Sequence, residues 1–282
     1  MDEYLKIEFE FLSEQQKETA IALLSEMNYE GFEEEGDLLK AYVLSSLFNE
    51  NELKQLIAAK DLFCTITRME NRNWNQLWES NFHPVIINHL ISGRAWVGIR
   101  AEFHKIMSGV EFEIIITPKM SFGTGHHATT SMMIQMMGQL DFKGKSVLDF
   151  GTGTGVLAIL AEKLGASKIV GIDNDSQSID NASENFVSNN CKNIQLIHAS
   201  SPERIGRYDI ILANITRSVI VENLHAFGDQ LTERGVLLLS GILLEDEGAI
   251  VKSAEKTRLI ADKKMAVDQW LALRMTYAHN MI

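Results

Sequence analysis

The chain is poor in cysteine and proline and lacks any long apolar run. Its 282 residues include 3 prolines and 2 cysteines, Cys64 and Cys191. Two cysteines form no disulfide framework and suit a reducing compartment, so we expect a cytoplasmic protein. No apolar stretch approaches the roughly 20 residues of a membrane span, and the acidic residues 1–4 do not resemble a signal peptide. The scarcity of proline and of biased tracts excludes long disordered segments.

Positive charge is also scarce, and the shortage is concentrated at one end. The net charge is −12, and residues 1–70 contribute −10 of it, with 16 acidic and 6 basic residues. Such a module does not suit a phosphate backbone, so we expect no direct nucleic-acid binding. The acidic surface either serves solubility alone or steers a basic partner toward the first 70 residues.

Residues 1–70 follow the order β-α-β-β-α-β. Apolar and charged side chains alternate over residues 5–11, the period of a half-buried strand. Ser13 and Gln16 form a capping box that begins a helix, and Gly36 marks a hairpin between the next two strands. This order is typical of a ferredoxin-like α+β domain, an arrangement with too many functions to assign a role by itself.

Residues 71–90 are expected to form a linker with a short helix. Trp74 and Trp78 are four residues apart, so they share one face of that helix, which ends at His83 before Pro84. The two rings either pack the linker against a domain or stack on a ligand.

Residues 91–282 are expected to form an α/β domain. From Leu140 onward, short apolar strands alternate with helical patterns, which predicts a mostly parallel sheet with helices on both faces. A last strand over 270–275 is predicted to be antiparallel. The strands of the parallel part are predicted at 146–150, 168–172, 194–198, 209–213 and 235–240.

A glycine-rich loop follows the first of these strands. Gly151, Gly153 and Gly155 allow a tight turn and a close approach of the backbone to a ligand. The dinucleotide pattern G-x-G-x-x-G/A would require a small residue at position 156, which is Val156. A pyrophosphate loop is therefore a poor match, and the alternative to a cofactor loop is a structural turn beside a capping aspartate.

The spacing D-x-G-x-G-x-G, which begins at Asp149, resembles motif I of class I S-adenosylmethionine-dependent methyltransferases. The resemblance implies a Rossmann-like, seven-stranded domain with S-adenosylmethionine as methyl donor and S-adenosylhomocysteine as product. Asp173 ends the next strand, 22 residues after Gly151, where a carboxylate accepts hydrogen bonds from ribose hydroxyls. By the same resemblance, Ser200 at the end of the third strand lies near the adenine.

The fourth strand ends at Asn214, which is followed by Ile215, Thr216 and Arg217. In this class of enzymes the residue at this position faces the transferable methyl group. Enzymes that methylate glutamine or adenine typically have Asn/Asp-Pro-Pro-Tyr/Phe there, so its absence argues against those substrates. The alternative role for Asn214 is that of a helix N-cap.

The tetrapeptide Phe-Gly-Thr-Gly occurs at 122–125 and at 150–153, here called the first and the second FGTG loop. His126, His127, Ala128, Thr129 and Thr130 follow the first copy. Residues 117–130 resemble the signature of the ribosomal protein L11 methyltransferases (the PrmA family), which is close to D-P-G-x-A-F-G-T-G-x-H-x-T-T. The positions that depart from that signature are Thr117, Lys119 and Ser121.

This resemblance covers almost the whole chain and implies a protein N-methyltransferase. The implied substrates are lysine ε-amines, and the N-terminal α-amine, of the basic ribosomal protein L11, with residues 1–70 as the substrate-recognition domain. The alternative is a methyltransferase for another protein or for a small-molecule amine. We expect a monomer, and no metal site, because no ligand spacing accompanies His126 and His127.

The resemblance also assigns roles to individual residues of this sequence. The first FGTG loop is expected to fold over the cofactor and exclude water. The catalytic candidates are Asn214, Phe122, Gly123 and His127. The cofactor-binding candidates are Thr130, Asp149, Gly151, Gly153, Asp173, Ser200 and Asn214.

Overall fold

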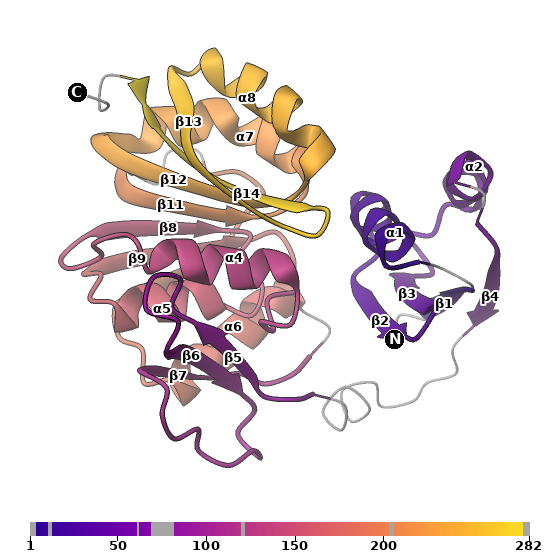
Figure 1. Cartoon of the computed structure of the whole chain (residues 1–282), viewed down its shortest axis with the longest axis horizontal. Coiled ribbons are helices and arrows are strands. Elements are labelled where there is room, and N and C mark those ends of the chain that lie inside the picture. Colours follow the sequence, from indigo (N-terminus) through magenta and orange to yellow (C-terminus); the bar gives the residue numbers. More distant parts are fainter. Residues whose placement is uncertain are drawn as a thin grey trace. The chain divides into compact units, whose positions relative to one another are not determined.

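The chain divides into two compact units, Met1–Leu77 and Trp78–Ile282. The predicted helix with Trp74 and Trp78 lies outside the residues that the structure describes. In the described parts of the chain, no helix has both the length and the apolar character needed to cross a membrane. The structure, a computed structural model, describes residues 4–10, 13–60, 62–68, 82–119, 122–202 and 206–278 (Figure 1).

The described residues of the first unit form a four-stranded antiparallel sheet with two helices. The sheet order is β2-β3-β1-β4. The predicted capping box begins the first helix, because Gln16 N donates to Ser13 Oγ (3.3 Å) and Ser13 N donates to Gln16 Oε1 (3.0 Å). The elements in chain order are β1 (Tyr4–Phe9), α1 (Glu14–Glu26), β2 (Gly31–Glu35), β3 (Leu38–Leu44), α2 (Glu50–Lys60) and β4 (Cys64–Arg68).

The second unit is built on a seven-stranded mixed sheet in the order β10-β9-β8-β11-β12-β14-β13. The strands from β10 to β12 are parallel, and β14 runs antiparallel to both of its neighbours, as predicted for the last strand. The sequence patterns did not indicate β13. The strands are β8 (Ser146–Phe150), β9 (Lys168–Asp173), β10 (Ile194–His198), β11 (Tyr208–Asn214), β12 (Leu231–Leu243), β13 (Leu259–Val267) and β14 (Trp270–Tyr277).

Helices cover both faces of this sheet (Figure 1). Leu148 of β8 packs in a core cluster with Ile220 and Phe227 of α7, and α7 packs against α8. The next residue of β8, Asp149, points to the other face, where it accepts from Ala158 N of α5, and α5 packs against α4. The helices are α4 (Ala128–Met137), α5 (Val156–Lys163), α6 (Ser176–Ser188), α7 (Arg217–Gln230) and α8 (Glu247–Glu255), with a 3-10 turn, η1 (Leu244–Asp246), before α8.

A separate three-stranded sheet precedes the first FGTG loop. It consists of β5 (Val85–Asn88), β6 (Ala95–Arg100) and β7 (Phe112–Ile115), with β6 and β7 parallel. The strand β5 lies within the range expected to be a linker and pairs with β6 of the second unit. α4 contacts β5 and α5 contacts β7, so this sheet determines where the chain enters the first FGTG loop.

Candidate active site

The site lies at the carboxyl edge of the parallel strands. In the register of the sheet, Phe150 of β8 pairs with Ile172 of β9 on one side and with Ala213 of β11 on the other. The residues that follow these positions, Gly151, Asp173 and Asn214, therefore meet at one edge. This is where open α/β sheets bind their ligands.

The second FGTG loop brings its backbone against its neighbours. Gly151 and Gly153 have positive φ angles, +73° and +53°. A Cβ on Gly153 would lie 2.4 Å from the Phe122 carbonyl oxygen, and one on Gly151 would lie 2.2 Å from Ile215 Cγ2. Only glycine fits both positions, so the loop can turn tightly against Phe122 and Ile215.

The buried side chain of Asp149 stabilises this loop through hydrogen bonds. Its side chain is 1% exposed, and its Oδ2 accepts from Thr152 Oγ1 (2.7 Å) and Ala158 N (3.2 Å). Its Oδ1 has no hydrogen-bond partner among the described residues. Burial raises the pKa of Asp149 to about 7. The carboxyl group joins the loop to the start of α5, which orders the loop.

Asp173 joins β9 to the same loop. Its Oδ2 accepts from Gly153 N (2.9 Å) and its Oδ1 accepts from Asp175 N (3.1 Å). Burial raises the pKa of this carboxyl above its ordinary value. An ionised carboxylate has about four acceptor positions, so Asp173 can accept further hydrogen bonds from a ligand.

Ser200 lies at the same edge, two residues after β10, and is exposed. In the strand order β10-β9-β8-β11, Ser200 and Asn214 stand at the two ends of a row, with Asp173 and Gly151 between them. A ligand that contacts all four has to extend across the strand ends.

The two FGTG loops are joined through Thr154. Thr154 N donates to the Phe122 carbonyl oxygen (3.0 Å), and Thr154 Oγ1 donates to the Gly123 carbonyl oxygen (2.8 Å). Sequence reasoning did not assign Thr154 a role. Its position between Gly153 and Gly155 of motif I could have indicated such a role, because a side chain in this tight turn points toward a neighbouring segment.

His127 is the N-cap of α4. Its Nδ1 accepts from Thr129 N (3.3 Å) and lies 2.8 Å from Thr129 Oγ1, so the cap assigns the ring proton to Nε2. The ring packs against Phe122 (centroids 5.3 Å apart) and edge-on against Trp270 (4.6 Å). Burial lowers the pKa of His127 to about 4, so the imidazole is neutral near pH 7 and adds no positive charge to the site.

Asn214 connects β11 to α4. Its Nδ2 donates to Oγ1 of the buried Thr130 (3.3 Å), and its Oδ1 is buried without a hydrogen-bond partner in the described parts of the chain. The alternative role as a helix N-cap is wrong, because the N-cap of α7 is Thr216. The unused amide oxygen is an acceptor available to a ligand.

Five of the ten predicted residues line one small hollow between the two loops. The predicted residues outside this lining are His127, Asp149, Gly153, Asp173 and Ser200, the last two further along the strand edge. Thr152, Val156 and Leu157 belong to the hollow although the sequence analysis assigned them no contact with it. The lining residues are Phe122, Gly123, Thr130, Gly151, Thr152, Val156, Leu157 and Asn214.

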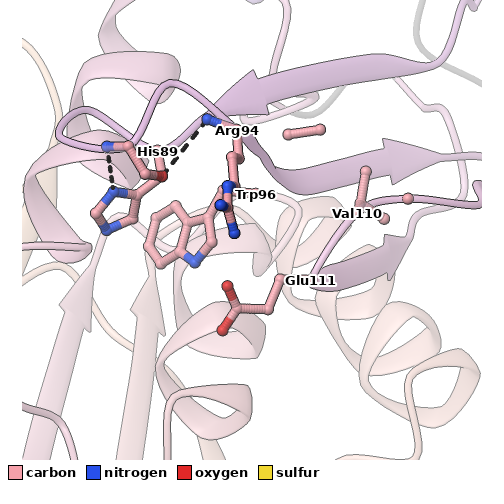
Figure 2. Close-up of a pocket in the computed structure, with 8 residues that line it drawn as sticks. His89, Arg94, Trp96, Val110 and Glu111 are labelled. Carbon is pink, nitrogen blue, oxygen red and sulfur yellow. Dashed lines mark hydrogen bonds between the residues drawn. The ribbon is translucent and has the colours of Figure 1, made fainter.

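A larger hollow of about 470 Å³ lies on the three-stranded sheet (Figure 2). His89, Trp96 and Glu111 contribute to its wall, and the His89 and Trp96 rings meet edge-on with centroids 5.2 Å apart. These residues precede or begin β6 and β7, whereas the first FGTG loop follows the end of β7. The larger hollow is therefore not part of the site at the strand edge.

The glycine loop after β8, the acid at the end of β9, the asparagine at the end of β11 and the antiparallel β14 define a class I methyltransferase. A family model described as ribosomal protein L11 methyltransferase (PrmA) matches residues 8–278. The chain belongs to this family, as the resemblance of residues 117–130 predicted. It is thus an S-adenosylmethionine-dependent protein methyltransferase.

Individual relatives agree with the family match. A ribosomal protein L11 methyltransferase of Porphyromonas gingivalis is 36% identical over 271 residues, 92% of this chain and 91% of the relative. One of Chlorobaculum tepidum is 35% identical over 267 residues and covers 90% of each chain. The crystal structure of a ribosomal protein L11 methylase from Lactobacillus delbrueckii subsp. bulgaricus has a TM-score of 0.61 at 26% identity, covering 68% of this chain and 98% of that one.

Proposed function

We propose that this chain transfers methyl groups from S-adenosylmethionine to lysine ε-amines, and to the N-terminal α-amine, of ribosomal protein L11. The substrate follows from the names of its relatives. The observation that carries the proposal is Asn214 Oδ1, a buried acceptor with no partner among the described residues, at the hollow between the two FGTG loops. An unpaired buried acceptor is unfavourable, so an N–H group of the acceptor amine is a suitable partner.

The residues at the strand edge fit S-adenosylmethionine, which supplies an electrophilic sulfonium methyl group when bound. The positive φ angles of Gly151 and Gly153 give the second FGTG loop its tight turn, and by the family resemblance its backbone groups cradle the methionine part. Asp173 has acceptor capacity left for ribose hydroxyls, and Ser200 lies further along the edge for the adenine. Thr130 holds the Asn214 side chain in place for this ligand.

The acceptor amine has to lose its proton before it attacks the methyl carbon. Lysine has an unperturbed pKa of about 10.4, and transfer into a site walled by Phe122, Val156 and Leu157 lowers it. His127 is neutral and, with a pKa of about 4, is too weak a base to take that proton, which leaves to water. Asn214 Oδ1 then orients the amine, and the reaction gains its rate mainly from positioning.

We infer that residues 1–70 form a ferredoxin-like domain that recognises the substrate protein, joined by the linker 71–90 to the catalytic domain 91–282. The sheet order β2-β3-β1-β4 and the element order β-α-β-β-α-β support the fold. The charge of −10 on these residues supports steering of a basic protein. We expect the enzyme to act as a cytoplasmic monomer.

The direct test is mass mapping of ribosomal protein L11 from a strain that lacks this enzyme, after incubation with the chain and S-adenosylmethionine. We expect methylated lysines with the wild type and about hundredfold slower transfer with Asn214→Ala. Asn193→Ala, an exposed asparagine on the loop before β10, is the control and should retain full activity. Unmodified L11 alongside normal donor binding would refute the proposed substrate.

The role of the first domain has its own test. Deletion of residues 1–70 should abolish methylation of L11 and leave donor binding intact. Association of the full chain with L11 should slow as ionic strength rises. Unchanged turnover after the deletion would refute substrate recognition by this domain, and an association rate indifferent to salt would assign its acidic surface to solubility.

A further inference from the structure

Helix α6 carries a row of asparagines that the methyl-transfer site does not explain. Asn181, Asn185 and Asn189 are spaced four residues apart and therefore share one face of the helix. Asn181 and Asn185 are fully buried. A buried amide is unfavourable unless its donors and acceptor are used, so the partners of this row indicate its purpose.

Asn185 joins the two segments that form the site. Its Oδ1 accepts from Thr117 N (2.7 Å), in the chain that leads into the first FGTG loop. Its Nδ2 donates to the Thr154 carbonyl oxygen (2.8 Å), in the glycine-rich loop after β8. One planar amide group thus bridges two backbone positions, Thr117 and Thr154, that are 37 residues apart in the sequence.

The neighbours of Asn185 hold only one of those segments. Asn189 Oδ1 accepts from Ile115 N (3.0 Å), and its Nδ2 donates to the Ile115 carbonyl oxygen (2.6 Å). Glu184 pairs with Lys119 (2.6 Å). Both contacts fix the chain between β7 and the first FGTG loop to α6, and neither reaches the glycine-rich loop.

Thr154 is the point where the three segments meet. It is fully buried, its N and Oγ1 donate to Phe122 and Gly123, and its carbonyl oxygen accepts from Asn185. Every hydrogen-bonding group of Thr154 is therefore used between the two FGTG loops and α6. Loss of the Asn185 amide would leave Thr117 N and the Thr154 oxygen without their partner, and the pair of loops would lose this connection to α6.

We propose that Asn185 is a positioning residue for methyl transfer, which holds the first FGTG loop at a fixed distance from the second. Asn185 is not among the residues that line the hollow, so it acts through Thr117 and Thr154. The assignment of the first FGTG loop to the binding of the acceptor amine rests on the proposed function. The expected effect on binding of the methyl donor does not rest on it, because the second FGTG loop belongs to motif I.

The test is Asn185→Asp, in which protonation replaces the lost donor. A protonated carboxyl can donate to the Thr154 oxygen and accept from Thr117 N, as the amide does, whereas the carboxylate can only accept. At about pH 8 we expect roughly tenfold weaker binding of S-adenosylhomocysteine and slower single-turnover methylation of L11 than in the wild type. Toward about pH 5.5, both deficits relative to the wild type should shrink, because burial raises the pKa of the introduced carboxyl.

Asn189→Ala is the matched control. Asn185→Ala removes both hydrogen bonds of the amide and introduces no group that titrates. Asn189→Ala should bind S-adenosylhomocysteine within about twofold of the wild type at every pH, since it spares Thr154. Asn185→Ala should bind it weakly at every pH, measured well below its melting temperature. Calorimetric titration of the full chain gives the affinities.

Two results would overturn the proposal. One is wild-type affinity and single-turnover rate in folded Asn185→Asp at every pH. The other is an equal, pH-independent deficit in the position-185 variants and in Asn189→Ala, which would mean that the row only stabilises the fold. If the wild type binds S-adenosylhomocysteine but leaves L11 unmodified, the proposed substrate fails, and the affinity measurements still decide the role of Asn185.

Discussion

The two FGTG loops have the same four residues and positive φ angles at their glycines, but their phenylalanines and threonines lie in different surroundings. Phe150 is 4% exposed and packs in the core edge-on to Phe227 (5.4 Å), whereas Phe122 is 41% exposed and packs against His127. Thr152 Oγ1 donates to the buried Asp149, whereas Thr124 Oγ1 lies 3.1 Å from His126 at the surface.

The helices that follow the two loops also begin differently. α5 begins after Gly155, which has a positive φ and provides no side-chain cap, and Asp149 Oδ2 instead accepts from Ala158 N in the first turn. α4 begins at His127, whose side chain fills the cap position. The comparison shows that the second loop is fixed by contacts in the buried core, whereas the first leaves its phenylalanine ring partly exposed.

Removing each phenylalanine should separate the two loops by stability. Phe150→Ala should lower the free energy of unfolding by about 3–5 kcal/mol, because it opens a cavity in the core. Phe122→Ala should cost less than about 1 kcal/mol, since its ring is largely exposed. Urea denaturation of both variants measures the difference, and equal losses would contradict the distinction between a core residue and a surface residue.

A methyl group on Gly153 should disable the second loop through its contact with the first. The added Cβ would overlap the Phe122 carbonyl oxygen, so Gly153→Ala should weaken binding of S-adenosylhomocysteine by more than about 2 kcal/mol. Gly144→Ala is the control, because Gly144 also has a positive φ (+72°) but no atom within 4 Å of an added Cβ. It should cost about 1 kcal/mol of stability and leave donor affinity unchanged. Similar affinities in both variants would mean that the loops do not depend on each other.

Asp149 should make the stability of the protein depend on pH through the second loop. Its folded pKa of about 7 lies above the ordinary value of 3.8, so the stability due to its protonated form is complete below about pH 4 and lost as pH rises to about 7. Relative to Asp149→Asn, the wild type should therefore lose on the order of 1–3 kcal/mol of unfolding free energy over this interval. A difference between the two proteins that stays constant with pH would contradict a buried, proton-binding Asp149.

The cap of α4 should have a small effect on stability and a larger one on catalysis. His127→Ala should lower the unfolding free energy by about 1 kcal/mol and slow methyl transfer, because α4 carries Thr130, the partner of Asn214. Ser13→Ala removes the cap of α1 in the first unit and should cost a similar amount without slowing transfer to a small test amine. Equal turnover of the two variants would mean that His127 only caps α4 and does not contribute to methyl transfer.

The parallel strands and the glycine loop could be predicted because their signals are local. The bounds of β8 and β10 match the predicted ranges, and the apolar runs that predicted them are bordered by glycine and polar residues. The edge strand β13 was missed because much of it is exposed, so its side chains do not show the apolar pattern of a buried strand.

The contacts that assemble the site could not be predicted from local patterns. Asn214 meets Thr130 from 84 residues away, and Asn185 meets Thr117 from 68 residues away. The three-stranded sheet β5-β6-β7 determines the path of the chain into the first FGTG loop, yet its strands are short and lie in a region expected to be partly linker. The family signature predicted residues of the candidate site, and the fold shows the hydrogen bonds by which Thr154 and Asn185 connect the segments around it.

We assign donor binding to the second FGTG loop and positioning of the acceptor amine to the first. The most direct test is single-turnover methylation of ribosomal protein L11 by the Phe122→Ala variant, started from its complex with the methyl donor. Phe122 belongs to the first loop, so we expect donor affinity close to that of the wild type and a transfer rate about tenfold lower or more. Loss of donor affinity with an unchanged transfer rate in the loaded complex would contradict the account, because it would place the first FGTG loop on the donor side.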